Sequence, residues 1–316
     1  MMRGAGSCWR KESEFVAAGI DAEKGIDLRI LITGINGFVG SYLTREMLRR
    51  GCEVLGVSRR DTPEDFYGHE KFTLIRSDLA GEALPPIEGI RAIFHFAGQA
   101  QPGGVSVTSY IRENILATQN LLTMALSSGV ANFIFASSLS VYGEIRSPVA
   151  DENTPITNPQ GYGLSKYMGE LLLGEASAKI SSVALRLPGI LGQNCRGPWL
   201  ANILQKVKQN QTVSLFNPDA KFNNAVHLSD LADWLFSLAG RNLAGFNPLT
   251  VGSDGPLTIL ETVRYMIGQT GSASRIEIQG NGRPSFWISN ERAKKEFGFR
   301  PMGMKELLAR FIRENS

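Results

Sequence analysis

The sequence predicts an α/β protein built on a doubly wound parallel sheet. Up to residue 189, short apolar segments alternate with helical segments, an order that places helices on both faces of a parallel sheet. A glycine-rich turn joins the first of these strands to the first helix, as in βαβ units that bind a dinucleotide. The chain has 316 residues, of which 43% are hydrophobic and 20% charged, enough for one large domain and a smaller lobe.

The strands and helices are expected in a regular order. Strands are predicted at 28–33, 53–57, 71–75, 92–96, 132–135 and 182–187, where apolar residues run together, and helices at 38–50, 109–128 and 162–178. Beyond residue 189 a loop-rich segment interrupts this rhythm. Later strands at 225–227 and 249–251 are expected to return to the sheet, with helices at 199–209, 257–268 and 290–297. The final helix should have an apolar face made by Met304, Leu307, Leu308, Phe311 and Ile312.

The glycine-rich turn after the first strand predicts a dinucleotide site. Gly34 permits a tight turn, Gly37 lets the backbone approach a pyrophosphate, and Gly40 lets the helix pack closely on the sheet. The N-terminus of that helix presents N–H groups and a positive dipole end to the phosphates. The alternative is a glycine-rich turn that binds nothing. We assign to cofactor binding the residues Gly34, Asn36, Gly37, Phe38, Val39 and Gly40.

The end of the second strand indicates which dinucleotide is bound. An NAD site usually has Asp or Glu there to bind the ribose hydroxyl, whereas this chain has Ser58-Arg59-Arg60. Two guanidinium groups suit a 2′-phosphate, so NADP(H) is favoured and NAD(H) is the alternative. The two arginines would otherwise be solvated surface residues. Asp78, with Leu79 beside it, is expected either at the adenine end of the cofactor or in a simple turn.

A tyrosine and a lysine in the middle of the chain predict proton transfer. Tyr162 and Lys166 lie one helical turn apart and share a face of the predicted helix. We expect the ammonium group to lower the pKa of the phenol, so that Tyr162 can exchange a proton with an oxygen of the substrate. Ser138, at the end of a strand, is expected to contact the same oxygen. A second copy of the spacing, Tyr67 to Lys71, has a loop-like setting and is interpreted as chance.

Together these motifs resemble the extended short-chain dehydrogenases/reductases, in their sugar-nucleotide epimerase/dehydratase group. The resemblance implies a Rossmann domain over 28–189, mainly a substrate-binding lobe over 190–316, a nucleotide-sugar substrate, a homodimer formed through paired helices, and catalysis by Ser138, Tyr162 and Lys166. Further cofactor contacts are assigned to Phe96, Ala97, Gly98, Asn114, Tyr162, Lys166, Pro188 and Ile190. Substrate contacts are assigned to Gln99, Ser138, Ser140, Asn202 and Arg283.

The chain departs from this family at positions that bear on the chemistry. Leu139 and Ser140 follow the catalytic serine where 4,6-dehydratases have Asp and Glu, so dehydration is not expected. Many members of the family have Asn at the position of Gly189 and Arg-Asp at the positions of Asn223-Asn224, where they contact the substrate diphosphate. Because this chain lacks those side chains, the usual binding of the diphosphate is in doubt. Lys221 could supply the lost charge, although a solvated lysine is the simpler interpretation.

Three functions remain open from the sequence. The first is an NADPH-dependent 4-keto reductase acting on a nucleotide-linked sugar, and the second is a C4 epimerase that retains NAD. The third is a nucleotide-sensing protein without catalysis, which the retained serine, tyrosine and lysine disfavour.

Composition excludes other classes of partner. A net charge of +3 does not indicate nucleic-acid binding, and no apolar stretch has the length of a membrane span. The three cysteines, Cys8, Cys52 and Cys195, suggest neither disulfides nor a metal site, which favours the cytoplasm. Residues 1–27 are expected to be an extension ahead of the fold. His95 is expected in the core, and His227 at a strand–helix junction.

Overall fold

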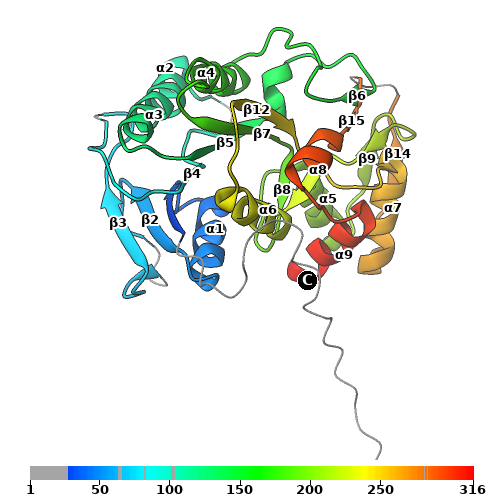
Figure 1. The fold of residues 1–316 in the computed structure, drawn as a ribbon. Helices are drawn as coiled ribbons and strands as arrows, with labels where there is room; N and C mark the ends of the chain where they lie inside the picture. The colour runs from blue at the N-terminus through cyan, green and yellow to red at the C-terminus, as the bar shows by residue number, and fades with distance from the viewer. Residues whose placement is uncertain (1–27, 63–65, 82, 101–103, 281, 283) are drawn as a thin grey trace, which may run out of the picture.

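Seven parallel strands form the central sheet of the protein (Figure 1). The structure is a computed structural model that describes residues 28–316 apart from 63–65, 82, 101–103, 281 and 283, so the predicted extension at 1–27 lies outside the described residues. In spatial order the strands are β12 (Phe246–Thr250), β7 (Ser181–Leu187), β5 (Asn132–Ser138), β4 (Ala92–His95), β1 (Arg29–Thr33), β2 (Glu53–Ser58) and β3 (Phe72–Arg76). The predicted doubly wound α/β class is confirmed.

The strand order creates a switch point beside β1. The chain proceeds from β1 outward to β2 and β3, and then crosses to β4 on the other side of β1. The last residue of β1, Thr33, therefore pairs with Val57 of β2 on one side and His95 of β4 on the other. In open α/β sheets, ligands bind in the crevice outside the carboxyl ends of the strands at such a point.

Helices cover both faces of the sheet because successive strand residues point to opposite sides. Ile30 and Ile32 of β1 pack in the core beneath α1 (Phe38–Arg49) and α6 (Leu228–Gly240). Leu31 packs in the opposite core with α3 (Ala117–Ser127) and α4 (Tyr162–Glu175). Figure 1 shows these two pairs of helices on opposite sides of the strands. Each fully buried leucine or isoleucine contributes roughly 1.5–3 kcal/mol to this packing.

The helix predicted at 109–128 is interrupted by a wider turn. Its first part is α2 (Val107–Tyr110), its middle is a π-helical turn, η3 (Ile111–Leu116), and its last part is α3. The hydroxyl of Thr118 donates to the carbonyl of Asn114, four residues before it, at 2.6 Å. Residue periodicity alone does not distinguish this turn from a regular helix.

One of the two late strands does not return to the large sheet, contrary to the prediction. The strand at 225–227, β11 (Ala225–His227), pairs with β8 (Gly189–Leu191) in a separate two-stranded sheet. The reason is that β12 already occupies the edge of β7, while the chain beyond Pro188 offers β8 as a new edge. The strand predicted near 249–251 lies in the seven-stranded sheet as β12.

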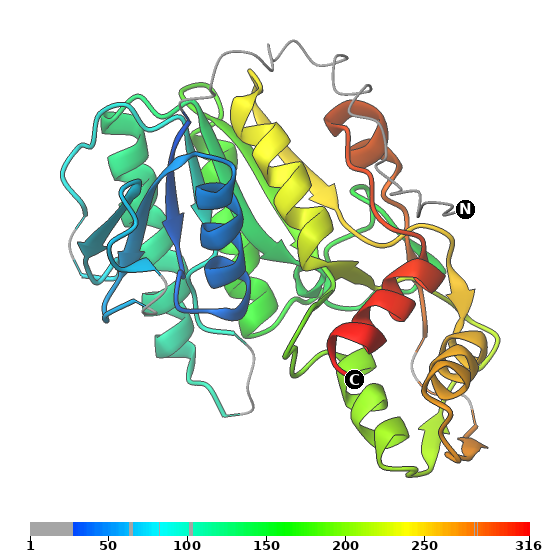
Figure 2. The ribbon, with the colours of Figure 1, turned by 90° about the horizontal axis from the view of Figure 1, so that it is seen from below.

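The remaining elements form a lobe beside the sheet, visible at one side of Figure 2. Its core lies between α5 (Trp199–Lys208), α7 (Ile259–Thr270) and α9 (Met304–Glu314). All five apolar residues predicted on the face of the final helix are buried there, which confirms that prediction. No helix in the described part of the chain is long and apolar enough to cross a membrane.

Short paired strands and one further helix complete the fold. The pairs are β9 (Val213–Leu215) with β14 (Ile276–Ile278), β10 (Lys221–Phe222) with β13 (Leu257–Thr258), and β6 (Val149–Ala150) with β15 (Trp287–Ile288). The helix α8 (Glu291–Phe297) packs against β12. The β6–β15 pair connects the lobe to the segment that follows β5.

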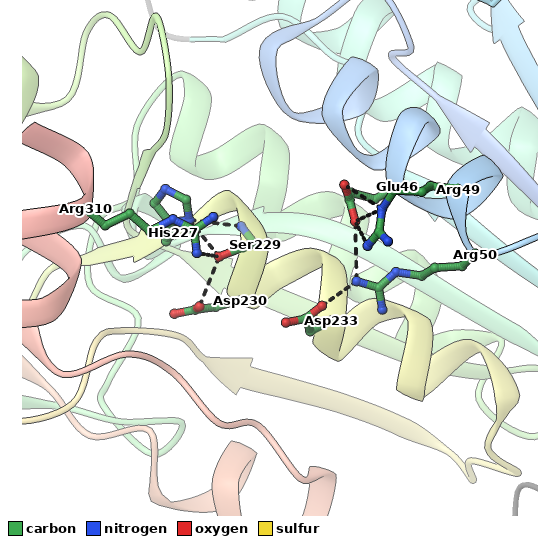
Figure 3. A network of polar contacts seen from close by, with 8 residues as sticks. All are labelled: Glu46, Arg49, Arg50, His227, Ser229, Asp230, Asp233 and Arg310. Atoms are coloured by element: carbon green, nitrogen blue, oxygen red, sulfur yellow. Dashed lines mark hydrogen bonds and ion pairs between the residues drawn. The ribbon is translucent and has the colours of Figure 1, made fainter. Parts of the chain in front are cut away.

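Two groups of polar contacts tie α6 to its neighbours (Figure 3): one joins it to α9, and the other, through Arg50 and Asp233, joins it to α1. His227 caps the N-terminus of α6 by accepting the N–H of Ser229, as predicted for a strand–helix junction. Its other ring nitrogen lies 2.9 Å from a carboxylate oxygen of Glu314 in α9. Arg310 of α9 donates to the Ser229 hydroxyl at 2.9 Å. Since these groups come from α6 and α9, they fix the lobe relative to the sheet.

Candidate functional site

A groove of about 340 Å³ lies at the switch point of the sheet. It brings together most of the residues predicted to bind a cofactor. The predicted cofactor residues that line it are Gly34, Asn36, Gly37, Ser58, Arg59, Arg60, Asp78, Leu79, Phe96, Ala97 and Gly98, and Gln99, predicted to contact the substrate, lines it too. Four segments distant in sequence thus meet at one edge of the sheet. The groove has the position expected for a dinucleotide in this type of sheet.

The glycine turn is shaped by close backbone contacts. Gly34 has a φ of +76°, and a Cβ atom there would lie 2.8 Å from the backbone of Ala97. A Cβ on Gly40 would lie 2.2 Å from the carbonyl oxygen of Gly34, so only glycine lets α1 start this close to the strand end. No side chain among the described residues caps α1 at Gly37. Its first N–H groups therefore suit a pyrophosphate, and the turn fits a dinucleotide cofactor.

The two arginines after β2 stand at one end of the groove. Arg59 forms an ion pair of 3.0 Å with Glu113, which also lines the groove. The guanidinium of Arg60 forms no ion pair with any residue that the structure describes. Asp61, the first carboxylate after β2, pairs with Arg76. Positive charge therefore predominates where a ribose hydroxyl or a 2′-phosphate would lie.

Asp78 stabilises a turn, which is one of the two roles that the sequence predicted for it. One carboxylate oxygen accepts the N–H of Ala80 at 3.1 Å, and the other pairs with Arg112. The residue still lines the groove beside Leu79. Asn36 extends across the same end, donating to the hydroxyl of Ser58 at 2.9 Å and so linking the glycine turn to the end of β2.

The predicted catalytic side chains come together at the end of β5. Ser138 is the last residue of this strand, and Tyr162 and Lys166 lie in the first turns of α4. The ammonium nitrogen of Lys166 is buried, 5.8 Å from the centre of the Tyr162 ring and 4.8 Å from that of Phe135. The second tyrosine–lysine copy is not on a helix, and Tyr67 is 54% exposed, which agrees with its interpretation as chance.

The expected acidification of Tyr162 by Lys166 is wrong for this structure. Burial raises the pKa of Tyr162 to about 12, against a hydrogen bond from Ser138 that lowers it. Burial also lowers the pKa of Lys166 to about 8. The physical reason is that desolvation disfavours both charged forms. Tyr162 is consequently a neutral phenol near neutral pH.

Asn114 links the groove to the catalytic cluster. Its side-chain oxygen accepts the N–H of Gln99 at 2.6 Å, and its amide donates to the Ser165 hydroxyl at 2.8 Å. A Cβ on Gly98 would lie 2.7 Å from that side-chain oxygen and 3.5 Å from the nitrogen of Lys166. Gly98 is thus the point at which the groove meets α4.

Sequence profiles and known structures agree with this geometry. The profile of the NAD dependent epimerase/dehydratase family matches residues 30–248, well over half of the chain. The chain belongs to this family. The resemblance predicted from the motifs is thereby confirmed, and the protein is an enzyme of the NAD-dependent epimerase/dehydratase family.

Individual relatives are distant. The chain is 27% identical to an uncharacterized UDP-glucose epimerase YtcB of Bacillus subtilis (strain 168), covering 87% of this chain and 93% of the relative. It is 24% identical to a dTDP-4-dehydro-6-deoxy-D-allose reductase of a Streptomyces species, covering 90% and 95% of the two chains. A structure of MoeE5 in complex with UDP-glucuronic acid and NAD has 25% identity and a TM-score of 0.75, over 90% and 98% of the two chains.

Positions where this family member departs from the common pattern have structural explanations. The side chain of Asn223 is buried and bonds the backbone of Ser253 and Ile288, so it holds the lobe together. A Cβ on Gly189 would lie 3.1 Å from Pro198, which occupies the space of a larger residue. Lys221 is exposed, with its ammonium 5.9 Å from the centre of the Trp287 ring.

Other predicted residues lie outside the groove. Ser140 donates its N–H to the hydroxyl of Ser138 at 3.1 Å, and Pro188 and Ile190 flank the junction of β7 and β8. Asn202 is exposed on α5 and donates to the carbonyl of Gly197 at 3.2 Å. Arg283 lies outside the described residues.

Two buried groups behave as inert residues. His95 bridges the hydroxyls of Thr33 and Thr118 at 2.8 and 3.0 Å, and burial lowers its pKa to about 3, as expected of a core residue. Burial raises the pKa of the Cys195 thiol to about 11. Neither group is suited to react near neutral pH.

The sequence interpretation missed several residues of the site. Ile35, Ser77 and Glu113 line the groove. Ile35 and Ser77 are neighbours of predicted residues and could have been included on position alone. Glu113 precedes the predicted Asn114, but its ion pair with Arg59 joins distant parts of the chain and has no signal in the sequence.

Proposed function

We propose that this enzyme reduces the 4-keto group of a nucleotide-linked sugar with NADPH. The observation that supports it most is the pair Arg59 and Arg60 in the groove, with the next residue in sequence, the carboxylate Asp61, engaged by Arg76. A 2′-phosphate would gain charge-assisted hydrogen bonds from guanidinium groups there. A phosphorylated cofactor that exchanges after each turnover makes the net reaction a reduction.

The side chains around Ser138 divide the chemistry between them. The bound cofactor would supply the hydride. Tyr162, a neutral phenol in a desolvated setting, donates its proton to the oxygen at C4. Ser138 donates a hydrogen bond to the same oxygen, and Lys166 would hold the nicotinamide ribose of the cofactor.

A nucleotide sugar is the substrate class that the relatives support. The YtcB and MoeE5 names refer to UDP-linked sugars and the reductase name to a dTDP-linked one. Leu139 and Ser140 give no general acid or base for dehydration. We propose that residues 28–189 with β12 bind the cofactor, and that the lobe over 190–316, with Gln99, Ser140, Asn202 and Arg283, binds the nucleotide sugar.

A C4 epimerase is the second candidate. It uses the same serine, tyrosine and lysine, but retains NAD and returns the hydride to the opposite face of the sugar. The observation in its favour is the likeness to YtcB, named as an epimerase, over 93% of that protein. The ion pair of Arg59 with Glu113 also favours it, since it reduces the charge available to a 2′-phosphate.

The identity of the bound nucleotide distinguishes these functions. We expect the purified protein, after denaturation, to release NADP(H) or no dinucleotide, and to oxidise NADPH in the presence of a nucleotide-linked 4-keto sugar. Mass spectrometry of the released nucleotide and absorbance of NADPH measure the two results. The double variant Arg59→Ala/Arg60→Ala should weaken NADPH binding about a hundredfold and leave NADH binding unchanged.

A matched arginine provides the control for this experiment. Arg49 is exposed on α1 and pairs with Glu46 at the amino edge of the sheet, so Arg49→Ala should not affect either cofactor. Stoichiometric release of NAD from the wild-type protein, with interconversion of nucleotide sugars and no consumption of NADPH, would exclude the reductase and establish the epimerase.

We also propose that two copies associate through α4 and its neighbour η3. Leu164, Met168 and Leu171 lie on one exposed face of α4, and Ile111 is exposed on the adjoining turn. Such an apolar stripe favours burial against a second copy. The double variant Leu164→Glu/Leu171→Glu should convert a dimer into a monomer, measured by analytical ultracentrifugation. Ile278→Glu, an equally exposed site on the lobe, should leave the dimer intact.

A further inference from the structure

A buried ion pair lies directly behind the catalytic cluster. Glu170 of α4 and Arg186 of β7 are 2% and 5% exposed. They form two parallel hydrogen bonds, from Nη2 to one carboxylate oxygen at 2.8 Å and from Nε to the other at 3.1 Å. Removing both charges from water costs free energy, and apolar side chains of similar size would pack at this place with equal or greater stability. The pair therefore calls for an explanation other than stability.

The pair connects the segments that carry or flank the catalytic residues. Ser137, next to Ser138 on β5, donates its hydroxyl to Glu170 at 2.5 Å. Arg186 donates to the phenol oxygen of Tyr142 at 2.9 Å, and Tyr142 ends the short helix η4 (Leu139–Tyr142) that starts after Ser138. One chain of hydrogen bonds thus joins β5, α4, β7 and η4.

Glu170 lies on the same face of α4 as the catalytic residues. Tyr162, Lys166 and Glu170 are spaced four apart, so all three point toward the end of β5. The helix is held very close on this side. A Cβ on Gly163 would lie 2.1 Å from the carbonyl of Ser140, and one on Gly169 would lie 2.6 Å from the ring of Phe135. At such separations, a rotation of α4 moves Tyr162 relative to Ser138.

We infer that Glu170 and Arg186 are positioning residues that fix the rotation of α4 against β5 and thereby hold Tyr162 beside Ser138. The inference rests on the proposed function, since it gives the ion pair a role in the proton transfer proposed above. A bidentate guanidinium–carboxylate pair is directional, unlike apolar packing. Ser137 carries this constraint to the strand, because its hydroxyl is the direct link between Glu170 and β5.

The test separates positioning from folding. The double variant Glu170→Met/Arg186→Met replaces the pair by apolar side chains of similar length, which preserves or raises stability in comparable cases. We expect its melting temperature and cofactor affinity to stay near the wild-type values and its KM to change little. The kcat should fall about a hundredfold, the effect of a misplacement of about 1 Å.

A milder variant covers the case in which the double variant does not fold. Ser137→Ala keeps the ion pair and removes its link to β5, and should lower kcat about tenfold. Ser182→Ala is the matched control: Ser182 is buried at the other end of β7, and its hydroxyl has no hydrogen-bond partner among the described residues. Its kcat should be unchanged.

A second measurement does not depend on the substrate. The Cζ resonance of Tyr162, in protein labelled with 13C-tyrosine and assigned by its loss in Tyr162→Phe, should shift in Ser137→Ala and in the double variant but not in Ser182→Ala. Wild-type kcat and an unshifted resonance in the folded variants would overturn the inference. If the wild-type protein turns over no nucleotide sugar, the proposed function fails, and the resonance alone decides whether the pair positions Tyr162.

Discussion

Replacing Tyr162 by phenylalanine should lower kcat by about a thousandfold while the affinity for the cofactor stays unchanged. The substitution removes only the phenol oxygen, the proton donor of the proposed reaction. Burial raises the pKa of Tyr162 to about 12, so this proton is present throughout the neutral range. Steady-state kinetics would measure kcat, and calorimetric titration with the dinucleotide would measure binding.

The second tyrosine–lysine copy supplies the control. Tyr67 has the same spacing to a lysine but is exposed, away from the groove, so Tyr67→Phe should leave both kcat and cofactor affinity unchanged. Wild-type turnover by Tyr162→Phe would show that the proton comes from another group. A loss of cofactor binding in the same variant would instead assign Tyr162 a structural role in the groove.

Replacing Gly40 by alanine should disrupt the cofactor site and destabilise the protein. The new Cβ would lie 2.2 Å from the carbonyl oxygen of Gly34. Because this oxygen belongs to the backbone and cannot rotate away as a side chain could, α1 must move away from β1. Overpacking of this kind costs about 1–3 kcal/mol, a few degrees in melting temperature. The displaced N–H groups should weaken dinucleotide binding roughly ten- to a hundredfold. Differential scanning calorimetry and equilibrium binding measure the two effects.

Gly268 is the matched control for this substitution. It lies in α7, and no heavy atom beyond its own helix lies within 4 Å of the position that a Cβ would take. Gly268→Ala should therefore stabilise the protein by about 0.5–1 kcal/mol, because alanine loses less conformational freedom than glycine in a helix. Equal effects of the two substitutions would show that the tight turn at Gly34 does not exist in solution.

Much of the fold and the centre of the site are predictable from local patterns. Six apolar segments, each ending at turn residues, mark strands of the sheet, because a strand buried on both faces must be apolar along its length. The glycine turn is predictable because only glycine tolerates the contact between Gly40 and the Gly34 carbonyl. Ser138, Tyr162 and Lys166 could be assigned because a strand end and a helical spacing already bring them near each other.

Other features were decided by the tertiary structure, since they depend on groups distant in sequence. The pairing of β11 with β8 follows from the edge of β7 being occupied by β12. The pKa of Tyr162 rises rather than falls because burial, which no spacing reveals, disfavours the phenolate more than the hydrogen bond with Ser138 favours it. Glu113 and Glu170 each look like an ordinary helical glutamate in the sequence. Each acquires its role only when the fold brings an arginine, Arg59 or Arg186, beside it.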